Sequence, residues 1–120
     1  MTAAITVFHN PDCGTSRNVL QFIRDAGHEP QVVDYLQVGW TRPQLEALLA
    51  DLGLTARDLL RVAKTPAEDM GLTDPAVSDD ALIAAMVAHP VLVNRPIVAT
   101  PAGTLLARPS ETVLPLLARL

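Results

Sequence analysis

The only cysteine of the chain, Cys13, stands in a run of turn and cap residues, His-Asn-Pro-Asp-Cys-Gly-Thr-Ser-Arg at positions 9–17. This run joins an apolar segment at 4–8 to a helix that we expect to begin near Gly14. Backbone N–H groups at a helix N-terminus lack partners within the helix, and together with the positive end of the helix dipole they favour a thiolate over a thiol. The sequence therefore predicts that Cys13 has a lowered pKa and can act as a nucleophile near neutral pH.

A lone cysteine is more often a small, inert residue of the core, and that alternative has to be weighed. The neighbours of Cys13 are turn formers rather than core residues, which favours the reactive interpretation. Ser16 occupies the position at which a Cys-x-x-Cys redox motif would need its second cysteine, so the chain cannot close a disulfide of its own. Two interpretations of Ser16 are open. Its hydroxyl donates to the thiolate, or Ser16 is an ordinary residue of the first helical turn.

Histidine is the other residue type here that could do chemistry. His9 lies four residues before Cys13 and could hold a proton near the thiol, organise the loop, or be a buried structural residue. The three histidines are isolated from one another and from the cysteine, so the spacing of metal ligands is absent. The sequence predicts no metal site.

Composition and charge limit the class of protein. The chain has 120 residues, 49% of them hydrophobic, which suits one domain, and its net charge of −4 argues against general binding to nucleic acids or anionic membranes. No apolar run approaches the length of a membrane span, and the single cysteine with no signal-like segment before the first strand predicts a cytoplasmic protein. Eight of the nine basic residues are arginines, whose planar guanidinium suits oxyanions, although an arginine-rich genome would give the same bias.

The elements that must position these residues follow from the hydrophobic pattern. We expect strands at 4–8, 31–35, 91–93, 97–100 and 104–107, and helices at about 14–26, 41–52, 55–60 and 78–88 and from about 110 to the end. Residues 64–75 are expected to form a loop with one helical turn, and Pro101-Ala102-Gly103 a hairpin turn. Pro115 fits the last helix only if that helix begins near Thr112.

The order of these elements predicts an α/β fold in one domain, 1–120. A strand, a helix and a strand within about 35 residues favour a right-handed βαβ unit with parallel strands. With the later hairpin and helix this gives a thioredoxin-like core, βαβ then ββα with a mixed sheet, and an all-helical insertion at about 41–88. In that plan the proline that opens the third core strand is commonly cis and faces the thiol, so we expect a cis bond at Pro96.

Four blocks of the sequence, in order, resemble the glutaredoxin-coupled arsenate reductases of the thioredoxin fold. They are His-Asn-Pro-Asp-Cys-Gly-Thr-Ser-Arg-Asn at 9–18, Leu-Leu-Arg at 59–61, Asn-Arg-Pro-Ile-Val at 94–98 and Arg-Pro-Ser-Glu at 108–111. The resemblance covers essentially the whole chain.

The resemblance implies a function in arsenic detoxification and roles for individual residues. Cys13 would attack arsenate to give a covalent adduct, while Arg61, Arg95 and Arg108 hold the oxyanion. Glutathione would be the co-substrate that releases arsenite, glutaredoxin would clear the resulting mixed disulfide, and no cofactor would be bound. The residues expected to support the thiolate or its loop are His9, Asn10, Gly14, Thr15, Ser16, Arg17 and Pro96.

Two other functions remain open at this point. A general glutathione-dependent thiol transferase would need Cys13 but not all three arginines, which could instead form surface ion pairs. A non-enzymatic relative of the RNA-polymerase-binding regulators of the same superfamily would commonly carry a Cys-x-x-Cys switch, and Ser16 disfavours it.

Overall fold

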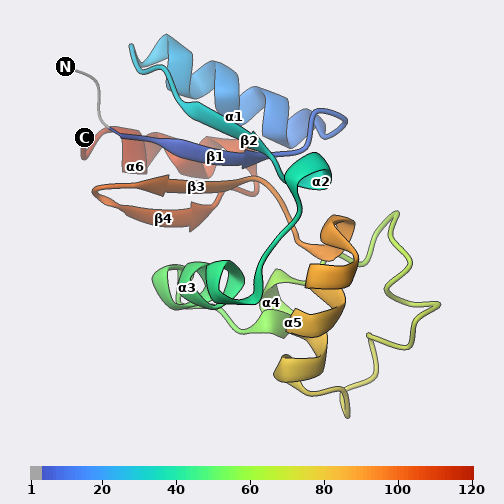
Figure 1. The fold of residues 1–120 in the computed structure, drawn as a ribbon. Coiled ribbons are helices and arrows are strands. Elements are labelled where there is room, and N and C mark those ends of the chain that lie inside the picture. The colour runs from blue at the N-terminus through green and yellow to red at the C-terminus, as the bar shows by residue number, and fades with distance from the viewer. Residues whose placement is uncertain (1–3) are drawn as a thin grey trace. The chain divides into compact units, whose positions relative to one another are not determined.

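The computed structural model describes residues 4–120, which form two compact units (Figure 1). The sheet unit contains the chain up to Val38 together with Arg95–Leu120, and the helical unit is Gly39–Asn94. The predicted helical insertion falls inside the second unit. That the whole chain is one domain stays a prediction.

The sheet unit contains four strands in the order β2-β1-β3-β4 (Figure 1). They are β1 (Thr6–His9), β2 (Gln31–Asp34), β3 (Ile97–Thr100) and β4 (Gly103–Leu106). β1 runs parallel to β2 and antiparallel to β3, and β3 runs antiparallel to β4. This mixed sheet confirms the predicted α/β, thioredoxin-like core. β1 is shifted toward the C-terminus relative to 4–8 because its ladder with β2 extends as far as the pair His9 and Asp34.

The hairpin between β3 and β4 forms where the turn residues predicted it. Thr100 pairs with Gly103, so the loop is Pro101-Ala102, and the Thr100 hydroxyl donates to the Gly103 carbonyl at 2.9 Å. Gly103 has φ +145°, a conformation that side chains rarely allow. The hairpin places the start of β3 beside the end of β4.

Helix α1 (Gly14–Asp25) follows Cys13 directly, as the sequence predicted. Gly27 lies just after the end of this helix, and its φ of +88° permits the His28 N–H to donate to the Ile23 carbonyl at 3.2 Å. The expected strand at 31–35 ends one residue earlier, at Asp34, and Tyr35 begins a short helix, α2 (Tyr35–Val38), that the sequence pattern does not predict. Asp34 starts this helix by accepting a hydrogen bond from the Leu36 N–H at 3.1 Å.

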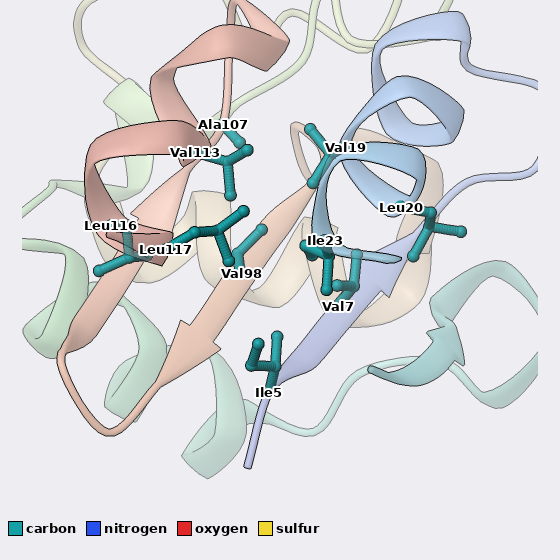
Figure 2. Close-up of a cluster of buried hydrophobic side chains, with 10 residues drawn as sticks. All are labelled: Ile5, Val7, Val19, Leu20, Ile23, Val98, Ala107, Val113, Leu116 and Leu117. Atoms are coloured by element: carbon teal, nitrogen blue, oxygen red, sulfur yellow. The ribbon is translucent and has the colours of Figure 1, made fainter. Parts of the chain in front are cut away.

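The core of the sheet unit gathers apolar side chains from β1, β3, α1 and the C-terminal helix α6 (Val113–Leu117) (Figure 2). Its buried residues are Ile5, Val7, Val19, Leu20, Ile23, Val98, Ala107, Val113, Leu116 and Leu117. A 3₁₀ turn, η2 (Ser110–Thr112), precedes α6. Pro115 is therefore in the first turn of α6, where its missing N–H has no intrahelical acceptor to lose.

The helical unit contains α3 (Arg42–Leu52), α4 (Ala56–Leu59), α5 (Asp79–Ala88) and a 3₁₀ helix, η1 (Pro90–Leu92). The predicted capping side chains begin all three α-helices: Thr41 and Thr55 form capping boxes, and Ser78 accepts from the Ala81 N–H. These local signals predicted the helices correctly.

The predicted strand at 91–93 is wrong. Pro90 opens η1, and the Leu92 and Val93 N–H groups donate to the His89 and Pro90 carbonyls, so the chain turns instead of extending. Val93 keeps one isolated bridge, to Leu60. The apolar run is explained by burial in the helical unit, where Leu92 and Val93 are fully covered.

Residues 64–75 form the expected loop of turns and bends, and the Met70 N–H donates to the Pro66 carbonyl at 2.9 Å, which is the hydrogen bond of one helical turn. The Arg57 guanidinium holds its far end by donating to the carbonyls of Asp74 and Val77, at 3.2 and 2.8 Å.

Candidate active site

Cys13 lies at the N-terminus of α1, as its N-cap residue. Its N–H donates to the Asn10 carbonyl at 3.0 Å, which closes a tight turn, and its carbonyl accepts from the Arg17 N–H at 3.0 Å, which starts the helix. The Ser16 backbone N–H reaches back to the Cys13 sulfur. Cys13 is 8% exposed, so the residue is largely shielded from water.

Two arginines converge on this sulfur. Arg108 Nη1 lies 3.7 Å from Cys13 Sγ and also donates to the Arg95 carbonyl at 3.0 Å. The Arg95 side chain, 8% exposed, hydrogen bonds to the same thiol. Three residues that are far apart in sequence therefore form one cluster of a nucleophile and two cations.

The sheet explains why these residues meet. β1 ends beside the start of β3, where Phe8 pairs with Ile97, and β4 ends beside the same point, where Leu106 pairs with Ile97. The Cys13 loop follows β1, Arg95 precedes β3 and Arg108 follows β4. All three segments leave the sheet at one end.

The cluster lowers the pKa of Cys13. Burial, the largest influence, raises it, but the Ser16 backbone N–H and the side chains of Arg95 and Arg108 together lower it to about 7 from 9.0. The lowered pKa agrees with the prediction from the helix N-terminus. The arginines, which belong to other segments, add to that local effect.

This pKa predicts the pH dependence of Cys13 alkylation. The rate of reaction with iodoacetamide should rise with pH, reach half its maximum near pH 7 and level off about one unit higher, because only the thiolate reacts. Free cysteine, with a pKa of about 8.5, is the control. A midpoint near that of the control would contradict the stabilising role of the cluster.

Arg61, the third arginine expected to hold an oxyanion, belongs to the helical unit. Its N–H donates to the Leu92 carbonyl at 2.7 Å, and its carbonyl accepts from the Thr65 hydroxyl at 2.7 Å. The backbone at Arg61 is thus fixed on both sides. Its role toward a substrate stays a prediction.

His9 and Ser16 form a buried pair beneath the Cys13 loop. His9 Nδ1 lies 2.7 Å from Ser16 Oγ, which also accepts from the Asn10 N–H at 3.2 Å. Burial lowers the pKa of His9, with a partly opposing effect from Asp34. Of the roles considered for His9, organising the loop fits these contacts. Ser16 binds His9 and Asn10 with its hydroxyl and meets the sulfur with its backbone N–H.

The remaining residues expected around the loop occupy the first turn of α1 and the start of β3. Arg17 Nη1 donates to the Pro11 carbonyl at 2.8 Å, which braces the loop. Gly14 opens the helix, and an added Cβ there would meet only Arg17, at 3.7 Å, so space alone does not require glycine. Thr15 lies half-buried in the same turn. The Arg95–Pro96 bond is cis, as predicted.

Tyr35 is a neighbour of the site that the sequence did not indicate. It is 1% exposed, burial raises its pKa to about 12, and the charges of Arg95 and Cys13 act on it. Its phenol hydrogen bonds to the Asn10 side chain. The register could have pointed to it, because parallel β1 and β2 end together, so Asn10 and Tyr35 each follow a strand at the same edge.

Within residues 4–120, no group of three or more His, Cys, Asp or Glu side chains could hold a metal ion. In the same part of the chain, no helix is long and apolar enough to cross a membrane.

Comparisons with known proteins agree with one another. Residues 8–116 match the sequence profile of the ArsC family. The chain is 56% identical to the arsenate reductase ArsI2 of Synechocystis sp. and 52% identical to the arsenate reductase of Escherichia coli K12, each over 113 residues that cover 94% of this chain and 81% or 80% of the relative. The solved arsenate reductase of Vibrio cholerae superposes with a TM-score of 0.90 at 36% identity, covering 96% of this chain and 98% of the other.

Proposed function

The chain belongs to the ArsC family, and from this premise we propose that it reduces arsenate to arsenite with Cys13 as the nucleophile. One observation carries the proposal: two guanidinium groups meet at a thiol whose pKa lies near 7. Arsenate is a tetrahedral oxyanion, so its approach to a thiolate requires cations that offset the repulsion between the two negative charges.

The first step forms a bond between sulfur and arsenic. The Cys13 thiolate donates its electron pair to arsenic, one As–O bond breaks, and the departing oxygen takes protons to leave as water. Arg95 and Arg108 both contact the Cys13 thiol, and this supports the proposal that they bind arsenate oxygens beside the sulfur. In this proposal Arg61 is the third ligand of the oxyanion.

The second step needs a thiol from outside the chain, because the sequence contains one cysteine. We propose glutathione as that co-substrate. Its sulfur attacks the Cys13 sulfur, a disulfide forms, and the electron pair of the S–As bond stays on arsenic, which leaves as arsenite. Glutaredoxin then reduces the mixed disulfide and restores the Cys13 thiolate. The cytoplasm, which keeps glutathione reduced, is the compartment we propose.

An assay with defined components tests both steps. Purified protein with arsenate, glutathione and glutaredoxin should produce arsenite over many turnovers, and omission of glutaredoxin should stop the reaction with glutathione attached to Cys13, detected by mass spectrometry. Production of arsenite with thioredoxin alone would assign a different reductant. Absence of arsenite with every thiol donor would refute arsenate reduction.

A further inference from the structure

Asn10 makes several of the hydrogen bonds that shape the loop before Cys13. It is 5% exposed, and its backbone N–H donates to Ser16 Oγ while its carbonyl accepts from the Cys13 N–H. Its side-chain oxygen accepts from the Asp12 N–H at 2.9 Å. The position of the Cys13 turn therefore depends on how firmly Asn10 is held.

Tyr35 contacts Asn10 from the end of β2, where its side chain is fully buried. The two side chains hydrogen bond, and this contact lowers the pKa of Tyr35, as a donor to the phenol oxygen does, so the Asn10 amide nitrogen donates to that oxygen. Tyr35 directly follows β2, and it is among the largest fully buried side chains. Asn10 lies outside regular structure. We therefore take Tyr35, at the end of β2, as the residue that fixes the position of the Asn10 loop.

We propose that Tyr35 is a positioning residue for Cys13: its hydroxyl holds the Asn10 side chain, and Asn10 fixes the turn from which Cys13 enters α1. The consequence for the reaction rests on the proposed function, in which Cys13 is the nucleophile. The effect on the pKa of the Cys13 thiol does not rest on the proposed function, because it follows from the geometry of the loop.

Loss of the hydroxyl should act on the sulfur through this turn. A buried amide without its partner carries a desolvation cost, which the loop can relieve only by moving. The donors that stabilise the thiolate, the Ser16 N–H and the Arg108 guanidinium, require Cys13 at its present place. Movement of the turn weakens both of these contacts to the sulfur, although the arginine side chains themselves are still present.

Tyr35→Phe is the first test, because it keeps the ring in the core and removes only the hydroxyl. We expect the midpoint of Cys13 alkylation to rise by about half to one pH unit, and alkylation at pH 6.5 to slow roughly threefold to tenfold. In the arsenate assay kcat should fall by a similar factor, with KM for arsenate changed less than about twofold. Equal thermal unfolding temperatures within a few degrees would show that the core is intact.

A double-mutant cycle with Asn10→Ala separates positioning from general loosening of the core. If Tyr35 acts through Asn10, adding Tyr35→Phe to Asn10→Ala should change the alkylation rate by less than about twofold. Full additivity of the two effects, or an unchanged alkylation midpoint in Tyr35→Phe, would overturn the proposal. If Tyr35→Phe does not fold, Asn10→Ala alone decides, and a midpoint that stays near pH 7 would overturn it. Alkylation needs no arsenate. The test of Tyr35 therefore remains valid even if the protein does not reduce arsenate.

Discussion

Replacement of Cys13 by serine is expected to abolish arsenite production, with a loss of at least about a thousandfold in kcat. A serine hydroxyl is far less acidic than a thiol whose pKa is about 7, so almost no nucleophile remains at neutral pH. The serine oxygen also cannot form the mixed disulfide with glutathione that releases arsenite in the proposed second step. The measurement is arsenite release in the defined assay.

The serine variant should fold normally, because serine keeps the size of the side chain and can take over the N-cap position. Circular dichroism and thermal unfolding serve as the control. The same variant should also lose all alkylation, since the chain has one cysteine. Retention of more than about one hundredth of the arsenate turnover would place the nucleophile on another residue.

Removal of Arg108 is the second change with a large expected effect. Arg108→Ala should lower kcat/KM for arsenate roughly a hundredfold, because the guanidinium contacts the sulfur and, in the proposed reaction, also binds the oxyanion. The alkylation midpoint should also move above pH 7. Arg108→Lys keeps the charge but loses the planar guanidinium, whose Nη1 contacts both Cys13 Sγ and the Arg95 carbonyl, so we expect an intermediate loss of about tenfold.

Arg119→Ala is the matched control for charge. Arg119 belongs to the same unit, is exposed, and donates to the Ala102 carbonyl in the hairpin loop. Its removal should change arsenate turnover by less than about twofold. An equal loss in both variants would show that net charge, and not the contact with the sulfur, is what matters.

The arginines also discriminate between arsenate reduction and general thiol transfer. Arg61→Ala and Arg95→Ala should each lose arsenate turnover while Cys13 still reacts with a small disulfide. A thiol transferase would need Cys13 but not all three arginines. Absence of arsenate turnover in the unmodified protein, with Cys13 still reacting with the small disulfide, would therefore favour the transferase interpretation.

The sequence by itself determined the local elements. Thr41 with Gln44, and Gly53 after the last turn, mark both ends of α3, because caps and helix stops depend on hydrogen bonds between residues three to five positions apart. The same short-range logic placed Cys13 at the N-terminus of α1 and predicted its lowered pKa. It failed at 91–93, where an apolar run fits a buried turn as well as a buried strand.

Only the tertiary structure decided what surrounds the sulfur. Arg108 is 95 positions from Cys13, and no local pattern distinguishes it from an arginine on the surface. It reaches the thiol because β1, β3 and β4 pair in a register that brings three strand ends together. Tyr35 and Asn10 meet for the same reason, through the parallel pairing of β1 and β2. Strand pairing joins residues that are distant along the chain, so its result cannot be obtained from periodicity within any one segment.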